Sequence, residues 1–143
     1  MKPVPRPSPI NQPYLEGCNR DELRLQQCSG CRKYVFYPRV CCPFCGSGTL
    51  VWARASGEGE VVSFTRVHRP QHESFFSETP YYFIAVRLKE GPTMFSRLLH
   101  QGPISESTLV GRGVQAVFVQ HTPEQRLPFF ALSRARVGIK PCP

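Results

Sequence analysis

Four cysteines in two closely spaced pairs carry the clearest chemistry in this sequence. Cys28 and Cys31 form one Cys-x-x-Cys pair, and Cys42 and Cys45 form a second pair after a spacer of ten residues. Four thiolates at this spacing can reach one tetrahedral zinc ion. Four cysteine ligands leave no position open for water, so the site is expected to be structural and not catalytic. The pattern predicts a zinc ribbon that holds one Zn²⁺.

The second pair carries two further signs of a metal knuckle. Pro43 stiffens the turn, and Gly46 supplies the positive φ that a tight knuckle uses. Binding of structural zinc is worth about 10–16 kcal/mol in small zinc peptides, more than a few short strands gain by burial. The segment is therefore expected to unfold without its metal. The other cysteines, Cys18, Cys41 and Cys142, are interpreted as free thiols.

Two alternatives to zinc are disulfides and a redox-active pair. Disulfides need an oxidising compartment, whereas the chain opens with Met-Lys-Pro-Val-Pro-Arg-Pro and shows no apolar stretch resembling a signal peptide. We therefore expect a reduced, cytoplasmic protein. A thioredoxin-like site uses one Cys-x-x-Cys pair in a βαβ context, but this sequence has two pairs and lacks that context. Zinc is the favoured interpretation.

Composition limits the remaining possibilities. Lys and Arg exceed Asp and Glu by 18 to 10, giving a formal charge of +8, which suits an anionic partner such as nucleic acid or a phosphorylated cofactor. Fifteen prolines and little helical periodicity predict a mostly β protein. No run approaches the roughly 18 apolar residues of a membrane span, so a soluble protein is expected.

The N-terminal third must position the two cysteine pairs. Residues 1–10 alternate proline with other residues and are predicted to form a proline-rich tail, and residues 11–22 are predicted to form a short helical segment. The zinc ribbon is assigned to residues 23–54. Its strands are expected around Leu23 and Leu25, at 35–37 and at 50–53, with Trp52 covering a small core.

The remainder, residues 55–137, is predicted to be a partly open Greek-key barrel of the OB type, followed by a C-terminal tail at 138–143. Two glycines in residues 55–59 mark the turn that leads into it. Short spacing and a longer connection after the third strand match this fold. The five strands are expected at residues 60–68, 81–88, 93–99, 114–120 and 129–134.

Several stretches in one order resemble a known family. They are Tyr-Leu-Glu-Gly (14–17), Leu-Arg-Leu-Gln-Gln-Cys (23–28), Cys-Pro-Phe-Cys-Gly-Ser (42–47), the stretch from Ala-Ser-Gly-Glu-Gly to Val-His-Arg (55–69) and Leu-Lys-Glu-Gly-Pro (88–92). The sequence over about residues 11–135 is similar to the OB-fold family with a rubredoxin-like zinc ribbon that is associated with acyl-CoA enzymes and was first catalogued as domain of unknown function thirty-five. The stretch at 55–69 directly after a ribbon is the specific part of this resemblance.

The resemblance implies a non-catalytic accessory subunit. Members of this family assemble with thiolase-like, hydratase-like or aldolase enzymes, and some help to hold the CoA thioester. The expected function is therefore a zinc-binding accessory subunit of an acyl-CoA enzyme, most readily a thiolase-type complex, in a hetero-oligomer. The four cysteines of the family pattern are all present. The Gln-His-Glu-Ser-Phe-Phe-Ser-Glu segment (71–78) departs from the commoner pattern, so the resemblance does not identify the partner.

Two groups of residues are candidates for these roles. Basic side chains near the end of the first barrel strand and on the third are candidates for the CoA phosphates, because arginine favours charge-assisted contacts with phosphate; they are Arg66, His68, Arg69 and Arg97. Aromatic residues before and within the second strand are candidates for a partner interface, where such residues are favoured; they are Phe75, Phe76, Tyr81 and Tyr82. The alternatives are a solvated strand end and a cover for the barrel.

A single-stranded nucleic-acid binder is the competing function. OB barrels with basic surfaces and zinc ribbons serve that role, but the sequence lacks a dense Lys/Arg run interleaved with aromatic residues. His100 and His121 are interpreted as isolated surface histidines. No serine–histidine–acid or cysteine–histidine arrangement is recognisable, so no catalytic residue is predicted.

Overall fold

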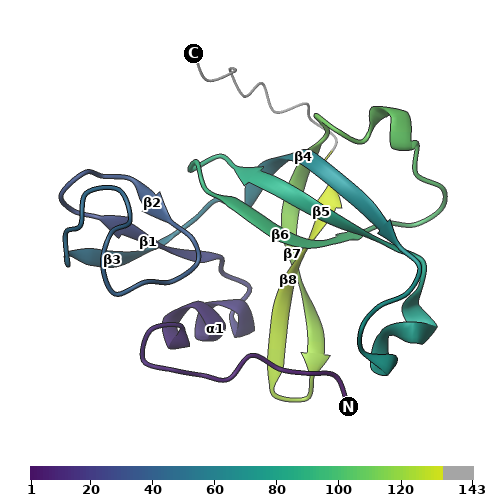
Figure 1. Ribbon diagram of the computed structural model, residues 1–143, viewed down its shortest axis with the longest axis horizontal. Helices are drawn as coiled ribbons and strands as arrows, with labels where there is room; N and C mark the ends of the chain where they lie inside the picture. Colours follow the sequence, from purple (N-terminus) through teal and green to yellow (C-terminus); the bar gives the residue numbers. More distant parts are fainter. Residues whose placement is uncertain (134–143) are drawn as a thin grey trace.

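The computed structural model describes residues 1–133, in which a small sheet and a closed barrel lie side by side (Figure 1). The helix α1 (Gln12–Asn19) precedes the small sheet and packs against its first strand and against the last strand of the barrel. The prediction of a mostly β protein with one short N-terminal helix, a ribbon and a five-stranded barrel is confirmed.

The helix is shorter than the predicted segment at 11–22. It ends at Asn19, and Asp21 follows with a φ of 59°, a left-handed conformation that cannot continue a helix. Leu15 and Cys18 are buried on the same face, as their spacing predicts. Asn11 occupies the N-cap position, but its Oδ1 accepts a hydrogen bond from the backbone N–H of Ser8 (2.7 Å) and does not cap the helix.

The small sheet contains β1 (Arg24–Cys28), β2 (Tyr34–Val35) and β3 (Leu50–Arg54), antiparallel in the order β2-β1-β3. Its own core consists of Cys28, Val35 and Cys42, with Leu50 packed against them. The prediction that Trp52 covers this core is wrong. Trp52 pairs with Gln26 in the strand register, further along β3 than Leu50, and is not among the residues that pack against the cluster.

The barrel closes in the strand order β4-β5-β6-β8-β7, with β4 and β7 completing the ring. The parallel contact between β6 and β8 is the feature that distinguishes this five-stranded Greek key from a simple meander. Its strands are β4 (Glu58–Val67), β5 (Tyr81–Leu88), β6 (Thr93–Leu99), β7 (Gly113–Thr122) and β8 (Gln125–Leu132). Two 3₁₀ helices, η1 (Glu73–Glu78) and η2 (Glu106–Thr108), lie in the longer connections.

Two glycines explain why β4 begins at Glu58, two residues before its predicted start. Gly57 has a φ of 76°, which glycine adopts at little cost. Gly59 lies within β4, where a Cβ atom would come 2.5 Å from Val86 Cγ1 and 2.8 Å from the Arg87 carbonyl oxygen. Close approach of β4 to β5 therefore requires a residue without a side chain.

The last strand begins earlier than predicted. β8 starts at Gln125, directly after a tight turn from Thr122, whereas the sequence predicts a start at 129. Pro128 explains why the sequence pattern places the start of β8 too late, because proline cannot donate a hydrogen bond to a neighbouring strand and is rare inside strands. Here its carbonyl oxygen accepts a hydrogen bond from Ser96 Oγ (2.5 Å). The predicted end of this strand at 134, the tail at 138–143 and Cys142 lie outside the described residues.

One hydrophobic core joins the two sheets. Leu23 and Leu25, at the start of the ribbon, are buried in the same cluster as Ile84 and Phe130 of the barrel. Tyr14 of α1 packs against this cluster as well. Ribbon, helix and barrel are therefore held by shared packing. Within residues 1–133, no helix has the length and apolar character needed to cross a bilayer.

Candidate functional site

The four predicted metal ligands come together at one end of the ribbon. Cys28 ends β1, Cys31 follows in the first turn, and Cys42 and Cys45 lie in the second turn. All four Sγ atoms lie within 4.8 Å of one another, and the Cys28–Cys45 and Cys31–Cys42 pairs are each separated by 3.6 Å. Tetrahedral zinc with bonds near 2.3 Å places its sulfurs about 3.8 Å apart. The donor set therefore fits a structural Zn²⁺.

Backbone groups hold the second turn in the form that a metal knuckle needs. Gly46 has the predicted positive φ, 75°, and its N–H donates to the carbonyl oxygen of Cys42 (2.9 Å). The N–H of Phe44 points at Cys42 Sγ at 3.4 Å. Such N–H···S contacts stabilise thiolate over thiol.

The sulfurs differ in acidity for identifiable reasons. Hydrogen bonding from the backbone N–H of Cys31 lowers the pKa of Cys28 to about 6. Burial alone would raise the pKa of Cys42, but the backbone N–H groups of Cys45 and Phe44 outweigh it, and the pKa is lowered. The backbone N–H of Ser47 lowers the pKa of Cys45, yet the neighbouring sulfurs, Cys28 first, raise it to about 11. Four crowded thiolates therefore require a bound cation.

The other cysteines play no part in this cluster. Cys18 is buried in α1, and burial raises the pKa of its thiol to about 11. Cys41 is exposed beside the ligand Cys42. All six cysteines of the described chain are free of disulfides.

The predicted phosphate-binding residues of β4 lie on a solvent-facing end of the barrel. Arg66 Nη1 lies 3.5 Å from Glu106 Oε1, so its charge is partly neutralised. His68 and Arg69 follow β4 and are exposed. Arg66, His68 and Arg69 are close in the sequence, but the carboxylate of Glu106 already pairs with Arg66.

Arg97 does not join that group. In the strand register, Arg66 of β4 pairs with Tyr82 of β5, and Arg97 of β6 pairs with the next residue of β5, Phe83. Successive residues of a strand point to opposite faces, so the two arginines lie on opposite faces of the sheet. Arg97 hydrogen-bonds to Glu78 and lies 3.9 Å from the ring centroid of Tyr81. The four predicted residues are thus not assembled into one cluster.

The four aromatic residues predicted at a partner interface have different environments. Tyr82 is only 7% exposed, and its hydroxyl donates to Glu106 Oε1 (2.8 Å), so it belongs to the barrel interior. Tyr81 lies under Arg97, and Phe75 stacks on His121. Phe76 on η1 is exposed. Of these residues, Phe76 is the best placed to meet a partner.

A different aromatic pair stands on the outer face of the barrel. Phe83 of β5 and Phe95 of β6 are 39% and 50% exposed, and their rings stack with centroids 6.0 Å apart. Leu99, further along β6 on the same face, is also exposed. The alternation of β5 places Phe83 with Arg87 and opposite to the buried Ile84 and Val86, so the sequence pattern contained the signal for this position.

A basic groove of about 930 Å³ lies between the metal knuckles and the β5–β6 turn. Arg32, Lys33 and Arg39 line its ribbon side, together with Tyr34 and Phe44. Lys33 Nζ lies 4.7 Å from the ring centroid of Phe44. These cations were not predicted as a site, because Arg39 follows β2 and joins the adjacent Arg32 and Lys33 only when the ribbon folds.

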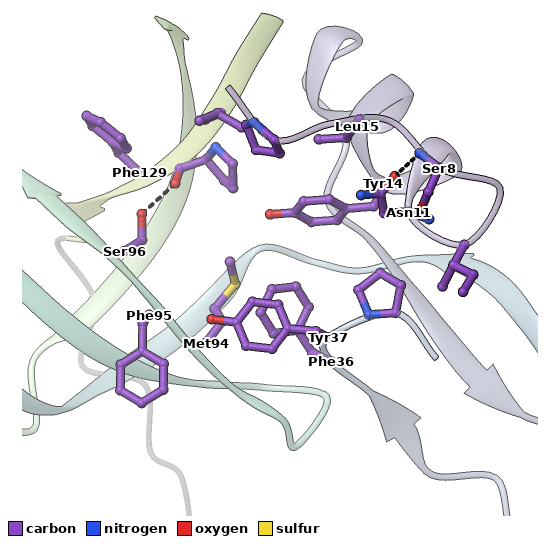
Figure 2. Close-up of a pocket in the computed structure, with 15 residues that line it drawn as sticks. Ser8, Asn11, Tyr14, Leu15, Phe36, Tyr37, Met94, Phe95, Ser96 and Phe129 are labelled. Carbon is purple, nitrogen blue, oxygen red and sulfur yellow. Dashed lines mark hydrogen bonds between the residues drawn. The ribbon is translucent and has the colours of Figure 1, made fainter. Parts of the chain in front are cut away.

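An apolar groove of about 500 Å³ lies where the N-terminal segment, the ribbon and the barrel meet (Figure 2). In Figure 2, Met94 of β6 lies between Tyr14 on the helix side and Tyr37 on the ribbon side. Its lining comes from five places in the chain: Pro5, Ser8 and Ile10; Asn11, Tyr14 and Leu15; residues 36–38; residues 94–96; and residues 127–129.

The predicted proline-rich tail crosses the β7–β8 hairpin (Figure 1). Lys2 forms an ion pair with Glu78. His121 Nε2 lies 2.8 Å from the carbonyl oxygen of Pro3 and donates to it, so this histidine is not isolated. Asn11 Nδ2 donates to the carbonyl oxygen of Arg6 (3.1 Å). We call residues 2–10 the N-terminal strap.

Both the ribbon and the barrel match families of known proteins. Residues 15–51 match the family model "ChsH2, rubredoxin-like zinc ribbon domain", and residues 52–119 match "ChsH2, C-terminal OB-fold domain". A solved structure described as "Ltp2-ChsH2(DUF35) aldolase" is similar, with 30% identity and a TM-score of 0.77 over 90% of this chain and 98% of that one. A DUF35 protein of unknown function from Sulfolobus solfataricus, 14% identical with a TM-score of 0.61 over 88% of this chain and 87% of that one, shares the fold.

Two curated relatives extend the comparison. A probable enoyl-CoA hydratase alpha subunit of Thermomonospora curvata is 31% identical over 130 residues, 91% of this chain and 40% of that protein. A DUF35 domain-containing scaffold protein of Pyrococcus furiosus is 35% identical over 69 residues, 48% of this chain and 50% of that protein. The matched part of this chain thus covers half or less of the length of each of these two relatives. With its four-cysteine ribbon followed by an OB barrel, the chain belongs to the DUF35 family, as a member of the ChsH2 type.

Proposed function

We propose that this protein is a non-catalytic accessory subunit that assembles with an enzyme acting on acyl-CoA thioesters. The names of its relatives support the proposal, since they describe an enoyl-CoA hydratase subunit, a scaffold protein and an aldolase that contains a DUF35 chain. The observation that carries it in this chain is the exposed, stacked pair of Phe83 and Phe95. Aromatic residues left on a rigid surface are typical anchors of protein interfaces.

The outer face of β5 and β6 serves as the docking surface in this proposal. Phe83, Phe95 and Leu99 present apolar side chains on adjacent strands of a closed barrel, so the surface is preorganised and loses little conformational freedom on binding. Phe76 on η1 supplies a further exposed ring. The zinc ribbon fixes the neighbouring surface, since its metal holds the knuckles in place.

We further propose that the partner is of the thiolase type and that the CoA moiety is held jointly. The basic groove supports this part, because Arg32, Lys33 and Arg39 supply three positive charges against the single carboxylate of Glu90, and Phe44 supplies a ring. Arginine and lysine suit phosphates, and an aromatic ring suits an adenine base. Arg66, His68 and Arg69 remain a second candidate for the same phosphates. The reacting groups reside on the partner.

The decisive experiment is affinity purification of the tagged, zinc-loaded protein from its own source, with the partner identified by mass spectrometry and its thioester chemistry assayed with and without this chain. We expect a stoichiometric enzyme subunit whose activity falls when this chain is removed. Recovery of an enzyme whose activity is the same without this chain would contradict the proposal.

Single-stranded nucleic-acid binding is the second candidate. The Phe83–Phe95 pair lies on the second and third barrel strands, the face with which OB folds stack bases. It is the weaker candidate because Arg97, the cation nearest to this pair in the strand register, is engaged by Glu78. Oligonucleotide affinity that falls steeply with salt, without affinity for CoA, would favour it.

A further inference from the structure

The apolar groove differs in chemistry from the rest of this basic protein. Charged residues make up 20% of the sequence, yet no charged residue lines the groove within the described chain. Tyr14, Phe36, Tyr37 and Phe129 give it aromatic walls. Sites for small molecules commonly have volumes of about 300–1,000 Å³, and this groove has about 500 Å³. Its size and lining suit a molecule with no charge.

The groove has a closed floor and an open rim. Leu15 and Met94 at the floor are buried, with Met94 only 1% exposed. Tyr37 and Ile10 at the rim are exposed. The one polar side chain of β6 in the lining, Ser96, is already satisfied by the carbonyl oxygen of Pro128. A molecule that enters the groove therefore makes apolar contacts, and its binding does not break an ion pair.

The N-terminal strap forms part of the rim. Pro5, Ser8 and Ile10 line the groove, and Asn11 holds the inner end of the strap through the Arg6 carbonyl oxygen. The outer contacts of the strap lie beyond the groove, where Lys2 pairs with Glu78 and the Pro3 carbonyl accepts from His121. The prolines restrict the backbone of the strap, so it costs little entropy to hold in place. At the outer end of the strap, a partly exposed ion pair and one hydrogen bond are weak fasteners.

We propose that the apolar groove is a binding site for a neutral, largely hydrocarbon molecule or group, and that the N-terminal strap covers the bound molecule. The site accepts an alkyl chain or ring and rejects its carboxylate counterpart, since an unpaired carboxylate is costly to bury and no cation lines the groove. This site does not rest on the accessory-subunit function. Its lining includes Phe95 of the stacked pair but not Phe83, so a change at Phe83 tests docking without altering the lining of the groove.

The two methionines of the chain provide a direct test. Met94 lines the groove, whereas Met1 is fully exposed. We would label both methyl groups with carbon-13 in the zinc-loaded, full-length protein and titrate it with octanol and, separately, with octanoate. We expect a saturable shift of the Met94 signal with octanol, an unchanged Met1 signal, and affinity for octanoate more than about tenfold weaker, because burying the unpaired charge costs over 1.4 kcal/mol.

Matched variants separate filling of the groove from general effects. Ile10→Trp places a larger side chain in the lining, and Val4→Trp makes the same change at a similarly exposed strap position outside it. We expect Ile10→Trp to abolish the octanol shift and Val4→Trp to preserve it. Circular dichroism and zinc content check that each variant is folded.

The strap is tested by loosening its outer fastener. Lys2→Met removes the pair with Glu78, and Lys89→Met removes the comparable pair with Glu58 elsewhere (3.0 Å). We expect octanol to dissociate about twofold to fivefold faster from Lys2→Met, the range that a partly exposed ion pair supports, and at the wild-type rate from Lys89→Met. The proposal fails if Met94 does not respond to octanol, if octanoate binds equally well, or if Ile10→Trp titrates like the wild type.

Discussion

Phe83 and Phe95 stack on adjacent barrel strands with ring planes only 8° apart, although both rings face solvent. They are diagonal neighbours, because in the strand register Phe83 pairs with Arg97 and Phe95 pairs with Ala85. The small side chain of Ala85 leaves the space above β5 open for this arrangement. An apolar pair in this position has no structural task inside the barrel, which makes it the natural focus of the first prediction.

Replacing Phe83 by Asp is expected to abolish association with the enzyme subunit while leaving the fold intact. The change removes one ring of the stacked pair and places a charge on an apolar interface, and truncation of such anchors costs about 2 kcal/mol or more. Val110→Asp, at another exposed apolar position, is the control. Copurification and calorimetry measure the effect. Equal loss of binding in both variants would show that the stacked pair is not the anchor.

Removal of zinc is expected to unfold the ribbon. Chelation leaves four crowded sulfurs without their cation, and structural zinc contributes about 10 kcal/mol or more to such units. Trp52 on β3 is the single tryptophan of the chain, so its fluorescence reports on the ribbon alone. We expect a red shift on chelation and in Cys28→Ser, and none in Cys41→Ser. A ribbon that keeps its spectrum without metal would contradict the structural role.

The buried Cys18 thiol is expected to resist alkylation that labels exposed Cys41. Burial raises the pKa of Cys18 from 9.0 to about 11, so the folded state disfavours the reactive thiolate. In a Cys142→Ser background, iodoacetamide at pH 8 should modify Cys41 quickly and Cys18 only on unfolding. Mass spectrometry of peptides gives the ratio. Comparable rates at the two positions would overturn the assignment.

The same shift predicts a loss of stability at high pH. A thiol whose folded pKa lies above its unfolded pKa stabilises the fold fully below about pH 9, and this contribution disappears as the pH rises towards 11. Denaturant unfolding of the wild type and Cys18→Ala between pH 8 and 11 measures it. The wild type should lose stability more steeply than the variant.

Gly59 should tolerate no side chain. A Cβ atom there would lie 2.5 Å from Val86 Cγ1 and 2.8 Å from a backbone oxygen that cannot move freely, so Gly59→Ala is expected to cost about 1–3 kcal/mol of unfolding free energy. Gly48→Ala is the control, because its Cβ would meet nothing within 4 Å. Thermal unfolding compares the two. Equal stability of the variants would show that β4 and β5 can separate without penalty.

Charge removal in the basic groove is expected to weaken CoA binding. Arg32→Met combined with Lys33→Met removes two of three cations that line it, and each lost charge-assisted contact is worth about 1.5–3 kcal/mol. Arg69→Met tests the alternative phosphate site just after the end of β4. Titration with CoA and dephospho-CoA, against adenosine as a neutral probe, distinguishes phosphate contacts from stacking. Unchanged affinity in both variants would exclude both sites.

Local patterns were enough to predict the metal ligands and the class of fold. The two Cys-x-x-Cys pairs fix four ligands because their spacing alone lets the sulfurs converge, as the structure shows. Alternation in 81–88 located β5 correctly, since one face of that strand is buried. Pro128 in β8 and Gly59 in β4 shifted the predicted strand limits, because proline and glycine usually interrupt strands and here lie within them.

Surface sites were harder to predict because they depend on distant segments. Arg66 and Arg97 were grouped by charge, but strand pairing places them on opposite faces. Tyr82 looked like an exposed anchor, yet alternation turns it inward to Glu106. The apolar groove draws on five separate stretches of chain, and no local pattern brings Pro5 near Tyr37 or Met94.

The packing of Leu23 and Leu25 into the barrel core has a consequence for how this protein can be divided. Family models meet between residues 51 and 52, but the shared core crosses that boundary. A fragment cut there would leave apolar side chains of both pieces facing water. The ribbon is therefore not an interchangeable module that can be transplanted onto another protein. Gene fusions that preserve function must carry the ribbon and the barrel together as one inseparable unit.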